Sequence, residues 1–401
     1  METCYEDGSK QMTEQDELWQ RKEETLKSSV DLTEIDQEIF KNFDYAFDGK
    51  SEFHVPMIPD VPEQFGIGVI YGSSGSGKSS ILKNFGSEEV IEWDANRSVA
   101  SHFDNVDDAI GRLSAVGLNS VPTWGKPRHV LSNGEGFRAD LARKLKTNCV
   151  IDEFTSVVNR DVAKSCSTAL SKYVKRNHLS NIILATCHED ILEWLEPDWV
   201  FNTDTLEISR RSLHRPQIQV KVHECSKTYW TMFAHHHYLS AEIPPIVDCY
   251  LATWDDVVIG FCCVICLPGK SPPLYEGDER IKYRGCRTVI LPDFQGLGLG
   301  VRLSDAVGDI YIEKGHRYFS KTAHMRMGEY RQKSTKWRAT ATNLVDRSRS
   351  SGSIRKNHVF NHIPLETERI CYSHEYIGEN RKSYDPKWQK LTQDTQEAFN
   401  F

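Results

Sequence analysis

The sequence predicts an α/β unit followed by an α+β unit, and three patterns support this fold class. Apolar, strand-like runs alternate with helix-like stretches from residue 66 to residue 208, which is typical of a parallel sheet covered by helices. From about residue 217 the pattern changes to paired strands and one strand–turn–helix–strand unit. Two glycine-rich turns, at 71–80 and 291–300, each follow an apolar run and precede a helix-like run.

Strands are expected where short runs are rich in Val, Ile and aromatic residues. In the first half these runs are 66–71, 89–93, 148–152, 181–186 and 199–202. In the second half they are 217–223, a hairpin within 246–266 that turns at 254–256, and 284–291, 317–322 and 368–378. Helices are expected at 31–43, directly after the first glycine-rich turn, and at 134–145, 159–176, 225–239 and 299–315.

The composition is that of a globular protein. The chain has 401 residues, of which 39% are hydrophobic and 26% charged, and this length allows two or three domains. Its N-terminus lacks the basic and apolar regions of a secretory signal, and no run approaches the roughly 18 apolar residues of a membrane helix. The 11 cysteines follow no regular spacing, which indicates reduced thiols, and those in 261–266 are expected to be buried in a strand. We therefore expect a cytoplasmic protein.

Charge is distributed unevenly along the chain. Residues 1–50 hold 14 acidic and 6 basic residues, which accounts for the whole net charge of −8. The stretch 321–356 holds ten basic residues, and its acids are Glu329 and Asp346. With Trp337 among its cations, this stretch has the composition that contacts phosphates and stacks on bases. We expect it either to bind nucleic acid or to be a solvated loop.

The first glycine-rich turn, GSSGSGKS at 72–79, has the pattern G-x-x-x-x-G-K-[ST] between a strand and a helix. Its glycines allow backbone N–H groups to surround a triphosphate at the start of the helix. Lys78 is expected to contact the β- and γ-phosphates, and Ser79 to bind Mg²⁺. The residues predicted to hold ATP are Gly72, Ser73, Ser74, Gly75, Ser76, Gly77, Lys78, Ser79 and Ser80.

Two successive carboxylates, Asp152 and Glu153, stand at the end of the apolar run 148–152. Asp152, at the carboxyl end of a strand, suits the Mg²⁺ shell, and Glu153 suits a base that orients the attacking water. His188 follows another expected strand and is placed to sense the γ-phosphate. Together with Ser79, these residues are the metal and catalytic candidates of an ATP-hydrolysing centre.

The stretch VLSNGEGFRADLAR at 130–143 resembles the LSGGQ signature of ABC-type ATPases and precedes the Asp152 strand, as in that family. TSVVNRD at 155–161 resembles the family's D-loop, and His188 resembles its switch histidine. The resemblance implies an ATP-dependent head-to-tail homodimer in which Ser132 and Gly134 contact the γ-phosphate bound to the partner. One departure is that no glutamine fits the family's Q-loop, for which the nearest match lies around His102.

The second turn, QGLGLG at 295–300, lacks the G-K-[ST] of a triphosphate loop. Gln295, Gly298 and Gly300 instead match Q/R-x-x-G-x-G/A, the acetyl-CoA loop of the GNAT N-acyltransferases, and the flanking strand and helix match as well. The alternative is a simple tight turn between a strand and a helix. The resemblance implies that this turn holds the pyrophosphate of acetyl-CoA or another acyl-CoA through Gln295, Gly296, Leu297, Gly298, Leu299 and Gly300.

In such an enzyme, an acceptor amine attacks the thioester directly once a nearby group accepts its proton. The candidates lie in AHHHYLS at 234–240 and after the strand at 317–322. They are His236, His237, Tyr238, Ser320, His324 and Tyr330. Each also fits a packing or surface role, and His223 with Cys225 offers a metal-binding alternative near the histidine run.

These observations divide the chain into an acidic N-terminal segment, 1–51, an ABC-type P-loop ATPase domain, 52–210, a GNAT-like domain, 216–378, and a tail, 379–401. This order resembles fused ABC–GNAT proteins of bacteria and phages, and the second half is similar to Mom-type proteins that modify adenine in phage DNA. The expected function is an ATP-gated, acetyl-CoA-dependent N-acyltransferase with ATPase activity that acts on nucleic acid. Two alternatives stay open: a protein or small-amine acceptor, and a non-catalytic clamp that only binds ATP and acyl-CoA.

Overall fold

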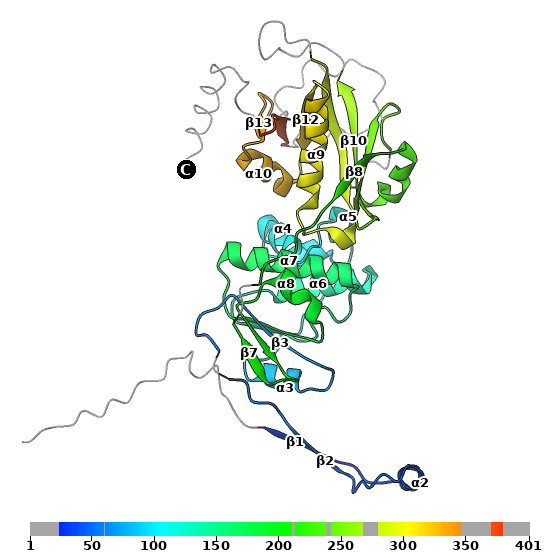
Figure 1. Cartoon of the computed structure of the whole chain (residues 1–401), viewed down its shortest axis with the longest axis vertical. Helices are drawn as coiled ribbons and strands as arrows, with labels where there is room; N and C mark the ends of the chain where they lie inside the picture. Colours follow the sequence, from blue (N-terminus) through cyan, green and yellow to red (C-terminus); the bar gives the residue numbers. More distant parts are fainter. Residues whose placement is uncertain are drawn as a thin grey trace, which may run out of the picture. The chain divides into compact units, whose positions relative to one another are not determined.

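The structure is a computed structural model that describes residues 24–59, 61–210, 213–237, 242–267, 280–345 and 370–379. The chain divides into two compact units (Figure 1). Apart from the short segment Ser120–Pro122, the division falls between Pro216 and Gln217. Within the described ranges, no helix is both long and apolar enough to cross a membrane.

The first unit is built on a five-stranded sheet with the order β4-β5-β3-β6-β7, in which only β7 is antiparallel to its neighbour. Its strands are β3 (Ile67–Tyr71), β4 (Cys149–Ile151), β5 (Ile182–Thr186), β6 (Trp199–Asn202) and β7 (Glu207–Ser209). Because β5 lies between β3 and β4, the carboxyl ends of these three parallel strands meet at one edge of the sheet. A segment that follows any of them begins at that edge.

Helices cover both faces of this sheet. Successive side chains of a strand point to opposite faces, so Val69 packs against the longer helices while Ile70 packs with Ile81 and Leu82 of the short helix α3. The helices are α3 (Lys78–Lys83), α4 (Val106–Ala115), α5 (Val121–Trp124), α6 (Asn133–Lys144), α7 (Arg160–Asn177) and α8 (Leu192–Leu195). The prediction of an α/β unit is confirmed.

The strand expected at 89–93 does not form, and these residues have no regular structure. Trp93 instead donates its indole N–H to Asp140 of α6 and lies beneath the guanidinium of Arg143, 4.8 Å from ring centroid to Cζ. Glu88 and Glu89 pair with Lys144 and Lys146 at the end of α6. This run therefore lies along α6, and Trp93 makes the contact with that helix, whereas Val90 is exposed.

The N-terminal part of the first unit is a separate small ladder. β1 (Thr25–Ser29) pairs antiparallel with β2 (Lys50–His54), and the expected helix forms between them as α2 (Glu34–Asn42). Thr33 begins α2 with a reciprocal capping box to Asp36. No residue of β1, β2 or α2 is buried, so this segment contributes little to the hydrophobic core.

The second unit contains a seven-stranded sheet with the order β13-β14-β12-β11-β10-β9-β8. Its strands are β8 (Lys221–Glu224), β9 (Asp248–Trp254), β10 (Val257–Leu267), β11 (Lys282–Ile290), β12 (Arg317–Thr322), β13 (Trp337–Ala339) and β14 (Tyr372–Tyr376). The β9–β10 hairpin turns at Asp255 and Asp256, which both have positive φ, as a tight type I′ turn requires. All neighbours are antiparallel except β11 and β12.

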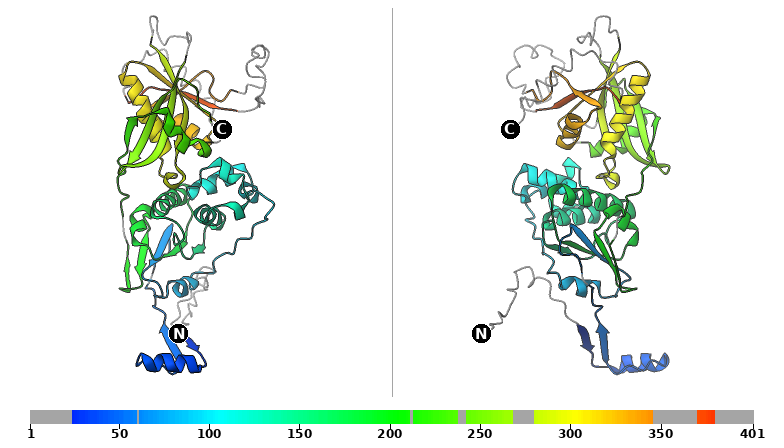
Figure 2. Two further views of the ribbon diagram at one scale, coloured as in Figure 1. Left: turned by 90° about the vertical axis from the view of Figure 1, so that its right-hand side faces the viewer. Right: turned by 60° about the vertical axis from the view of Figure 1, so that its left-hand side comes forward.

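The parallel pair β11–β12 is joined by α9 (Leu299–Glu313), which lies along one face of the sheet (Figure 2). A further helix, α10 (Met325–Lys333), follows β12 and packs on α9, β13 and β14. The mixed sheet with one β–α–β connection confirms the prediction of an α+β unit.

The helix expected over 225–239 is wrong. The described part of this stretch forms two short 3₁₀ helices, η4 (Lys227–Met232) and η5 (Ala234–His236). Aromatic and β-branched residues have low helix propensity, and the 3₁₀ spacing places Trp230 and Phe233 together on Phe261. Burial of these two rings therefore decides the local structure.

Candidate functional site

The turn 72–77 leaves the carboxyl end of β3 and leads directly into α3. Gly72, Gly75 and Gly77 have φ of 154°, 81° and 88°, and Gly77 is the N-cap of α3. Other residues adopt such φ values only with strain, so the glycines are needed for this path of the backbone. The turn thereby presents consecutive backbone N–H groups at the start of the helix.

Lys78 is buried beneath this turn. Its Nζ donates to the carbonyl oxygens of Gly72, at 3.0 Å, and of Ser73, at 2.6 Å. The ammonium group therefore lies inside the loop, where it can turn towards a phosphate oxygen.

A second segment, after β6, supports the same turn. Asp204 accepts hydrogen bonds from the backbone N–H and the hydroxyl of Ser73, at 2.9 and 2.7 Å. Thr203 Oγ1 lies 2.6 Å from Ser76 Oγ, and a Cβ at Gly72 would lie 2.1 Å from the same oxygen. The hydrogen bonds from Ser73 lower the pKa of Asp204. This support was not visible in the sequence, because the contacts join residues that are 131 and 127 positions apart.

Phe53 and Pro56 lie on another side of the turn. A Cβ at Gly77 would lie 3.0 Å from Phe53 Cε1 and 3.1 Å from Pro56 Cδ. Phe53 keeps 38% of its surface exposed, so its ring is a solvent-accessible apolar surface next to the loop. It was not among the predicted site residues.

The predicted carboxylates follow β4 at the same edge of the sheet. Asp152 accepts the backbone N–H of Glu153 at 2.9 Å, and Glu153 has φ of 50° and accepts from the hydroxyl of Ser156. Left-handed backbone at a glutamate is uncommon and indicates a constrained position. The exposed carboxylate of Glu153 is thereby held just beyond the strand end.

His188 follows β5, the strand that lies between β4 and β3 in the sheet. Its Nδ1 lies 3.1 Å from Thr155 Oγ1, and its backbone N–H donates to Thr186 Oγ1. Burial lowers the pKa of His188, and the nearby Arg160 lowers it further, against the opposing effect of Asp190 and Glu153. The imidazole is therefore neutral near pH 7 and can donate or accept a single hydrogen bond.

The expected Mg²⁺ donors suit that ion. The Ser79 hydroxyl and the Asp152 carboxylate are hard oxygen donors, and Ser79 is exposed on the first turn of α3. Among the residues described, no group of three or more His, Cys, Asp or Glu could hold a metal. Mg²⁺ bound together with nucleotide phosphates usually takes only one or two protein ligands.

The signature-like stretch forms the start of α6. Ser132 is the N-cap, and its hydroxyl and backbone N–H form a capping box with Glu135. Ser132 and Asn133 are exposed, and Gly134 faces Val158 of the stretch that resembles a D-loop. Two neighbouring side chains, Val130 and Val157, are 53% and 58% exposed.

The second glycine-rich turn begins where β11 ends. Gln295 donates its side-chain N–H to the carbonyl of Ile290 at 2.9 Å. Gly296 and Gly298 have φ of 93° and 85°, and Gly298 is the N-cap of α9. Gly300 packs near Ile290 and Met327, so the first turn of α9 lies close to the end of β11.

The strands beside this turn separate. β11 pairs with β12 only from Lys282–Arg317 to Gly285–Ser320, although β11 continues to Ile290. Beyond Gly285 the two strands no longer pair, although β11 continues to Ile290 and β12 to Thr322, and this divergence of the strands is called the wedge below. An extended ligand could hydrogen-bond to β11 in this wedge.

Two of the acceptor-side candidates lie at this wedge. Ser320 is the last residue of β12 paired with β11, and His324 is the N-cap of α10 just beyond the strand. In the described part of the chain, the buried Nδ1 of His324 has no hydrogen-bond partner. Burial lowers the pKa of His324, and the cations Arg326 and Arg331 add to this effect. A neutral imidazole with a free nitrogen results.

Tyr330 is half-buried, and its hydroxyl is bound to Asp305 instead. Its hydroxyl donates to Asp305 Oδ2 at 2.5 Å, and Trp337 Nε1 donates to the other oxygen of Asp305 at 2.7 Å. The guanidinium of Arg331 stacks over the Trp337 ring at 4.6 Å, and both residues are at least 95% buried. The prediction that Trp337 is free to stack on bases is therefore wrong, because its ring fills the space between α10 and the sheet.

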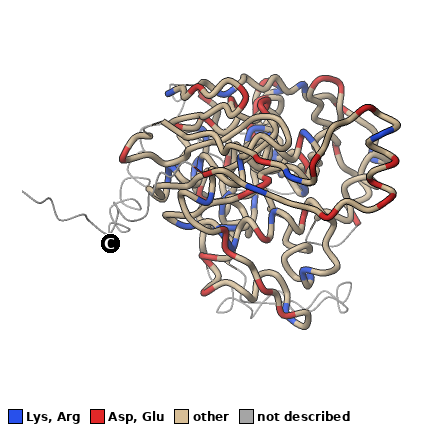
Figure 3. The backbone as a smooth tube through the Cα atoms, turned by 90° about the horizontal axis from the view of Figure 1, so that it is seen from below, with Lys and Arg blue, Asp and Glu red and all other residues tan. Residues whose placement is uncertain are grey.

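Not all cations of the basic stretch 321–356 are available at the surface. Arg338 and Arg317 both pair with the buried Glu375, and residues 346–356 lie outside the described residues. Acidic and basic residues are interspersed along the described backbone (Figure 3).

In the histidine run at 234–240, His237 lies edge-on to Trp230 and the ring of His236 contacts that of His235. Tyr238 lies outside the described residues.

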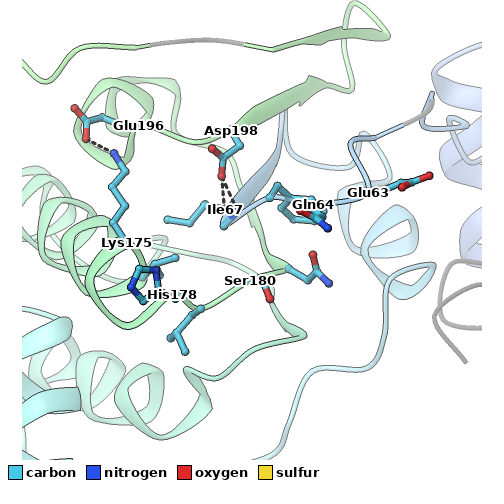
Figure 4. Close-up of a pocket in the computed structure, with 13 residues that line it drawn as sticks. Glu63, Gln64, Ile67, Lys175, His178, Ser180, Glu196 and Asp198 are labelled. Carbon is cyan, nitrogen blue, oxygen red and sulfur yellow. Dashed lines mark hydrogen bonds and ion pairs between the residues drawn. The ribbon is translucent and has the colours of Figure 1, made fainter.

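A cavity of about 600 Å³ lies at the opposite, amino end of the first sheet (Figure 4). It is lined by the start of β3, the end of α7 and the loop before β6, where Asp198 accepts the N–H groups of Gly66 and Ile67. It is therefore separate from the turn at 72–77.

Solved structures with partial similarity include both predicted classes. The dimeric structure of a bacterial ABC transporter cassette is 13% identical, with a TM-score of 0.29, over 38% of this chain and 87% of that one. A Bacillus subtilis acetyltransferase in complex with CoA is 14% identical, with a TM-score of 0.28, over 40% and 99%. An Elizabethkingia anophelis GNAT acetyltransferase with acetyl-CoA is 13% identical, with a TM-score of 0.23, over 40% and 97%. These values are too low to establish a shared function, and no protein-family model or curated protein matches the sequence.

Proposed function

We propose that the chain is an ATP-binding and ATP-hydrolysing unit joined to an acyl-CoA-dependent N-acyltransferase. One observation carries this proposal: two turns, each following a strand, end in left-handed glycine N-caps, Gly77 and Gly298. The first is followed by Lys78 within a G-x-x-x-x-G-K-[ST] pattern, which suits a triphosphate. The second opens onto separated strands and lacks that lysine, which suits a ligand with a pyrophosphate and an extended arm.

In the first unit, the backbone N–H groups of Ser74, Gly75, Gly77 and Lys78 bind the phosphates, and the Lys78 ammonium moves from its carbonyl partners to the β- and γ-oxygens. Ser79 and Asp152 would hold Mg²⁺, which supplies charge neutralisation when bound. Glu153 orients the attacking water, and His188 contacts the γ-phosphate as a neutral donor. The exposed ring of Phe53 beside Gly77 offers a stacking surface for the base.

In the second unit, the N–H groups at 296–300 bind the pyrophosphate and the free edge of β11 aligns the acyl-CoA arm. The acceptor amine attacks the thioester carbonyl, and His324 accepts its proton at Nδ1. Ser320 lies beside this position and orients the acceptor. Among the predicted acceptor-side residues, His324 is the best supported base because Tyr330 is hydrogen-bonded to Asp305.

An ATP-dependent homodimer is part of the proposal. Ser132 is exposed at the start of α6, and the exposed Val130 and Val157 flank it, as expected for a surface that meets a partner. Glu153→Gln should slow hydrolysis and trap the dimer with ATP. Sedimentation velocity of this variant with and without ATP measures the dimer, and an unchanged monomer with ATP bound would contradict this part of the proposal.

The acceptor is tested by supplying three classes of amine. Full-length protein is incubated with acetyl-CoA and ATP-Mg²⁺ together with duplex or single-stranded nucleic acid, a polyamine, or a lysine-rich peptide, and free CoA thiol is measured. We expect CoA release that requires an acceptor and is lost in Gly298→Val. Mass spectrometry of digested nucleosides distinguishes a nucleic-acid acceptor, and CoA release unaffected by Gly298→Val would contradict the acyltransferase proposal.

A further inference from the structure

Four cysteines follow one another across neighbouring strands of the second sheet. Cys225 lies just beyond β8, Cys249 in β9, Cys263 in β10 and Cys286 in β11. The N–H of Cys225 donates to the carbonyl of Cys249, and Cys249 is the direct neighbour of Cys263 in the β9–β10 register. All four contribute to the same apolar cluster beneath η4.

Two of these thiols are in contact. The Sγ atoms of Cys263 and Cys286 lie 3.1 Å apart. In the β10–β11 register Cys263 faces Arg287 and Val264 faces Gly285, so Cys286 is the extra residue of a β-bulge. The bulge sets Cys286 beside Cys263 across the strand pair. A disulfide bond is about 2.05 Å long, so the two sulfurs need to approach by only about 1 Å.

The two thiols differ in reactivity. Cys263 is fully buried, whereas Cys286 is half-buried and within reach of a small oxidant. The hydrogen-bonding contact with Cys263 lowers the pKa of the Cys286 thiol, with Arg287 and Arg284 adding to this against the effect of burial. The same contact, together with burial, raises the pKa of Cys263. Cys286 is thus the more readily ionised and more nucleophilic member.

We propose that Cys286 and Cys263 are a redox modification site that hydrogen peroxide converts to a disulfide. The Cys286 thiolate attacks one peroxide oxygen, the O–O bond breaks, and water leaves after protonation, which gives a sulfenic acid. The Cys263 thiol then attacks the Cys286 sulfur, the S–S bond forms, the S–O bond breaks and a second water leaves. In total, the two thiols lose two protons and two electrons, and one molecule of hydrogen peroxide is reduced to two molecules of water.

The position of the pair gives the modification a structural consequence. β11 pairs with β12 only as far as Gly285, the residue before Cys286. A disulfide at Cys286 therefore ties the bulge of β11 to β10 at the point where β11 leaves β12. The redox chemistry is independent of the proposed acyltransferase function, since it requires neither acyl-CoA nor an acceptor.

The test is a thiol map of the full-length protein treated with hydrogen peroxide and then digested without reduction. We expect one peptide pair joined through Cys263 and Cys286, lighter by two hydrogen atoms and released by dithiothreitol. Cys286→Ser and Cys263→Ser should each abolish this pair. Cys262→Ser is the matched control, because its sulfur lies 3.6 Å from Thr288 Oγ1, away from Cys286, and this variant should retain the linked pair.

The wild-type map decides the outcome even if a serine variant fails to fold. Unmodified thiols at both positions would overturn the proposal, and so would a Cys249–Cys263 link or oxidation of Cys286 without a link to Cys263. A disulfide at Cys286 that still forms in Cys263→Ser would also overturn it.

Discussion

The turn at 72–77 and the turn at 295–298 both end in a left-handed glycine that starts a helix, with φ, ψ of 88°, 9° at Gly77 and 85°, 15° at Gly298. They differ in what supports them. Thr203 and Asp204, from a segment far along the chain, contact the first turn, and Lys78 fills its centre. In the second, the side chain of Gln295 bonds back to Ile290, and the neighbouring strands separate.

This difference indicates two modes of anion binding. The first turn is closed by tertiary contacts before a ligand arrives, so its N–H groups are preorganised and a buried cation can be redirected to the ligand. The second turn offers N–H groups at the end of an open wedge, so the strand edge has to contribute to binding. Variants in one turn should therefore leave the ligand of the other turn unaffected.

The largest effect is expected from Lys78→Ala. It removes the only side-chain cation inside the first turn, as far as the described residues show, and should lower ATP hydrolysis by on the order of 100-fold or more. Phosphate release measures this effect. Lys83→Ala, on the exposed side of the same helix, is the control and should retain activity. Loss of CoA binding in Lys78→Ala would contradict the separation of the two sites.

Gly298→Val should weaken CoA binding by at least about tenfold, because a β-branched residue at this φ costs roughly 1–3 kcal/mol and displaces the N–H groups. Gly315→Val tests strain alone. Gly315 lies at the other end of α9 with φ of 75°, and a Cβ there would meet no atom within 4 Å. Calorimetric titration with CoA compares the two variants. An equal loss of affinity in Gly315→Val would mean that backbone strain, and not the displaced N–H groups of the turn at 295–298, weakens CoA binding.

Thr203→Val keeps the side-chain volume but removes the hydroxyl that contacts Ser76 and the carbonyl of Tyr71. A hydrogen bond contributes about 0.5–1.5 kcal/mol, so ATP affinity should fall roughly 2- to 10-fold. Fluorescent-nucleotide titration measures this change. An unaltered affinity would show that the first turn does not depend on the segment after β6.

The protonation of His374 should affect stability in acid but not at neutral pH. Burial lowers the pKa of His374 to about 4, with the charge of Arg331 adding to it. Because the unfolded chain binds this proton at higher pH, stability is present above pH 6.5 and is lost as pH falls towards 4. The loss amounts to about 3 kcal/mol for the second unit.

Urea unfolding at several pH values between about 4 and 6.5 measures how steeply the free energy of unfolding depends on pH. His374→Gln should flatten this dependence, whereas His223→Gln, which alters an exposed histidine of the same unit, should not. An unchanged slope in His374→Gln would show that another group controls acid stability.

A related pH test addresses acyl transfer. Because the pKa of His324 lies below its ordinary value, kcat/KM should be constant near neutral pH and fall only in acid. His324→Gln should lower the rate by about 100-fold or more and remove this acidic limb. A retained acidic limb in the variant would assign the proton acceptor to another residue.

The sequence identified the elements whose signal is local. The turn at 72–79, the strand ending before Asp152 and the helix after Gly298 are each defined by consecutive residues, and all three form where expected. The fold class followed from the alternation of such elements. Cysteines 262 and 263 are buried, as their apolar run predicted, although Cys266 is exposed.

Features that depend on tertiary packing were not visible in the sequence. The contacts of Asp204 with Ser73 join distant positions, and β14 reaches its place between β12 and β13 from beyond residue 369. The same limit explains the errors. Trp337 has the pattern of a surface aromatic among cations, and only the position of α10 shows that it is buried.

The central claim is that one chain carries two independent ligand sites, and a cross-titration tests it most directly. Full-length wild type, Lys78→Ala and Gly298→Val are each titrated by calorimetry with a non-hydrolysable ATP analogue and with CoA. We expect wild type to bind both ligands, Lys78→Ala to lose only the nucleotide and Gly298→Val to lose only CoA. Binding of CoA that disappears in Lys78→Ala, or survives unchanged in Gly298→Val, would contradict the claim.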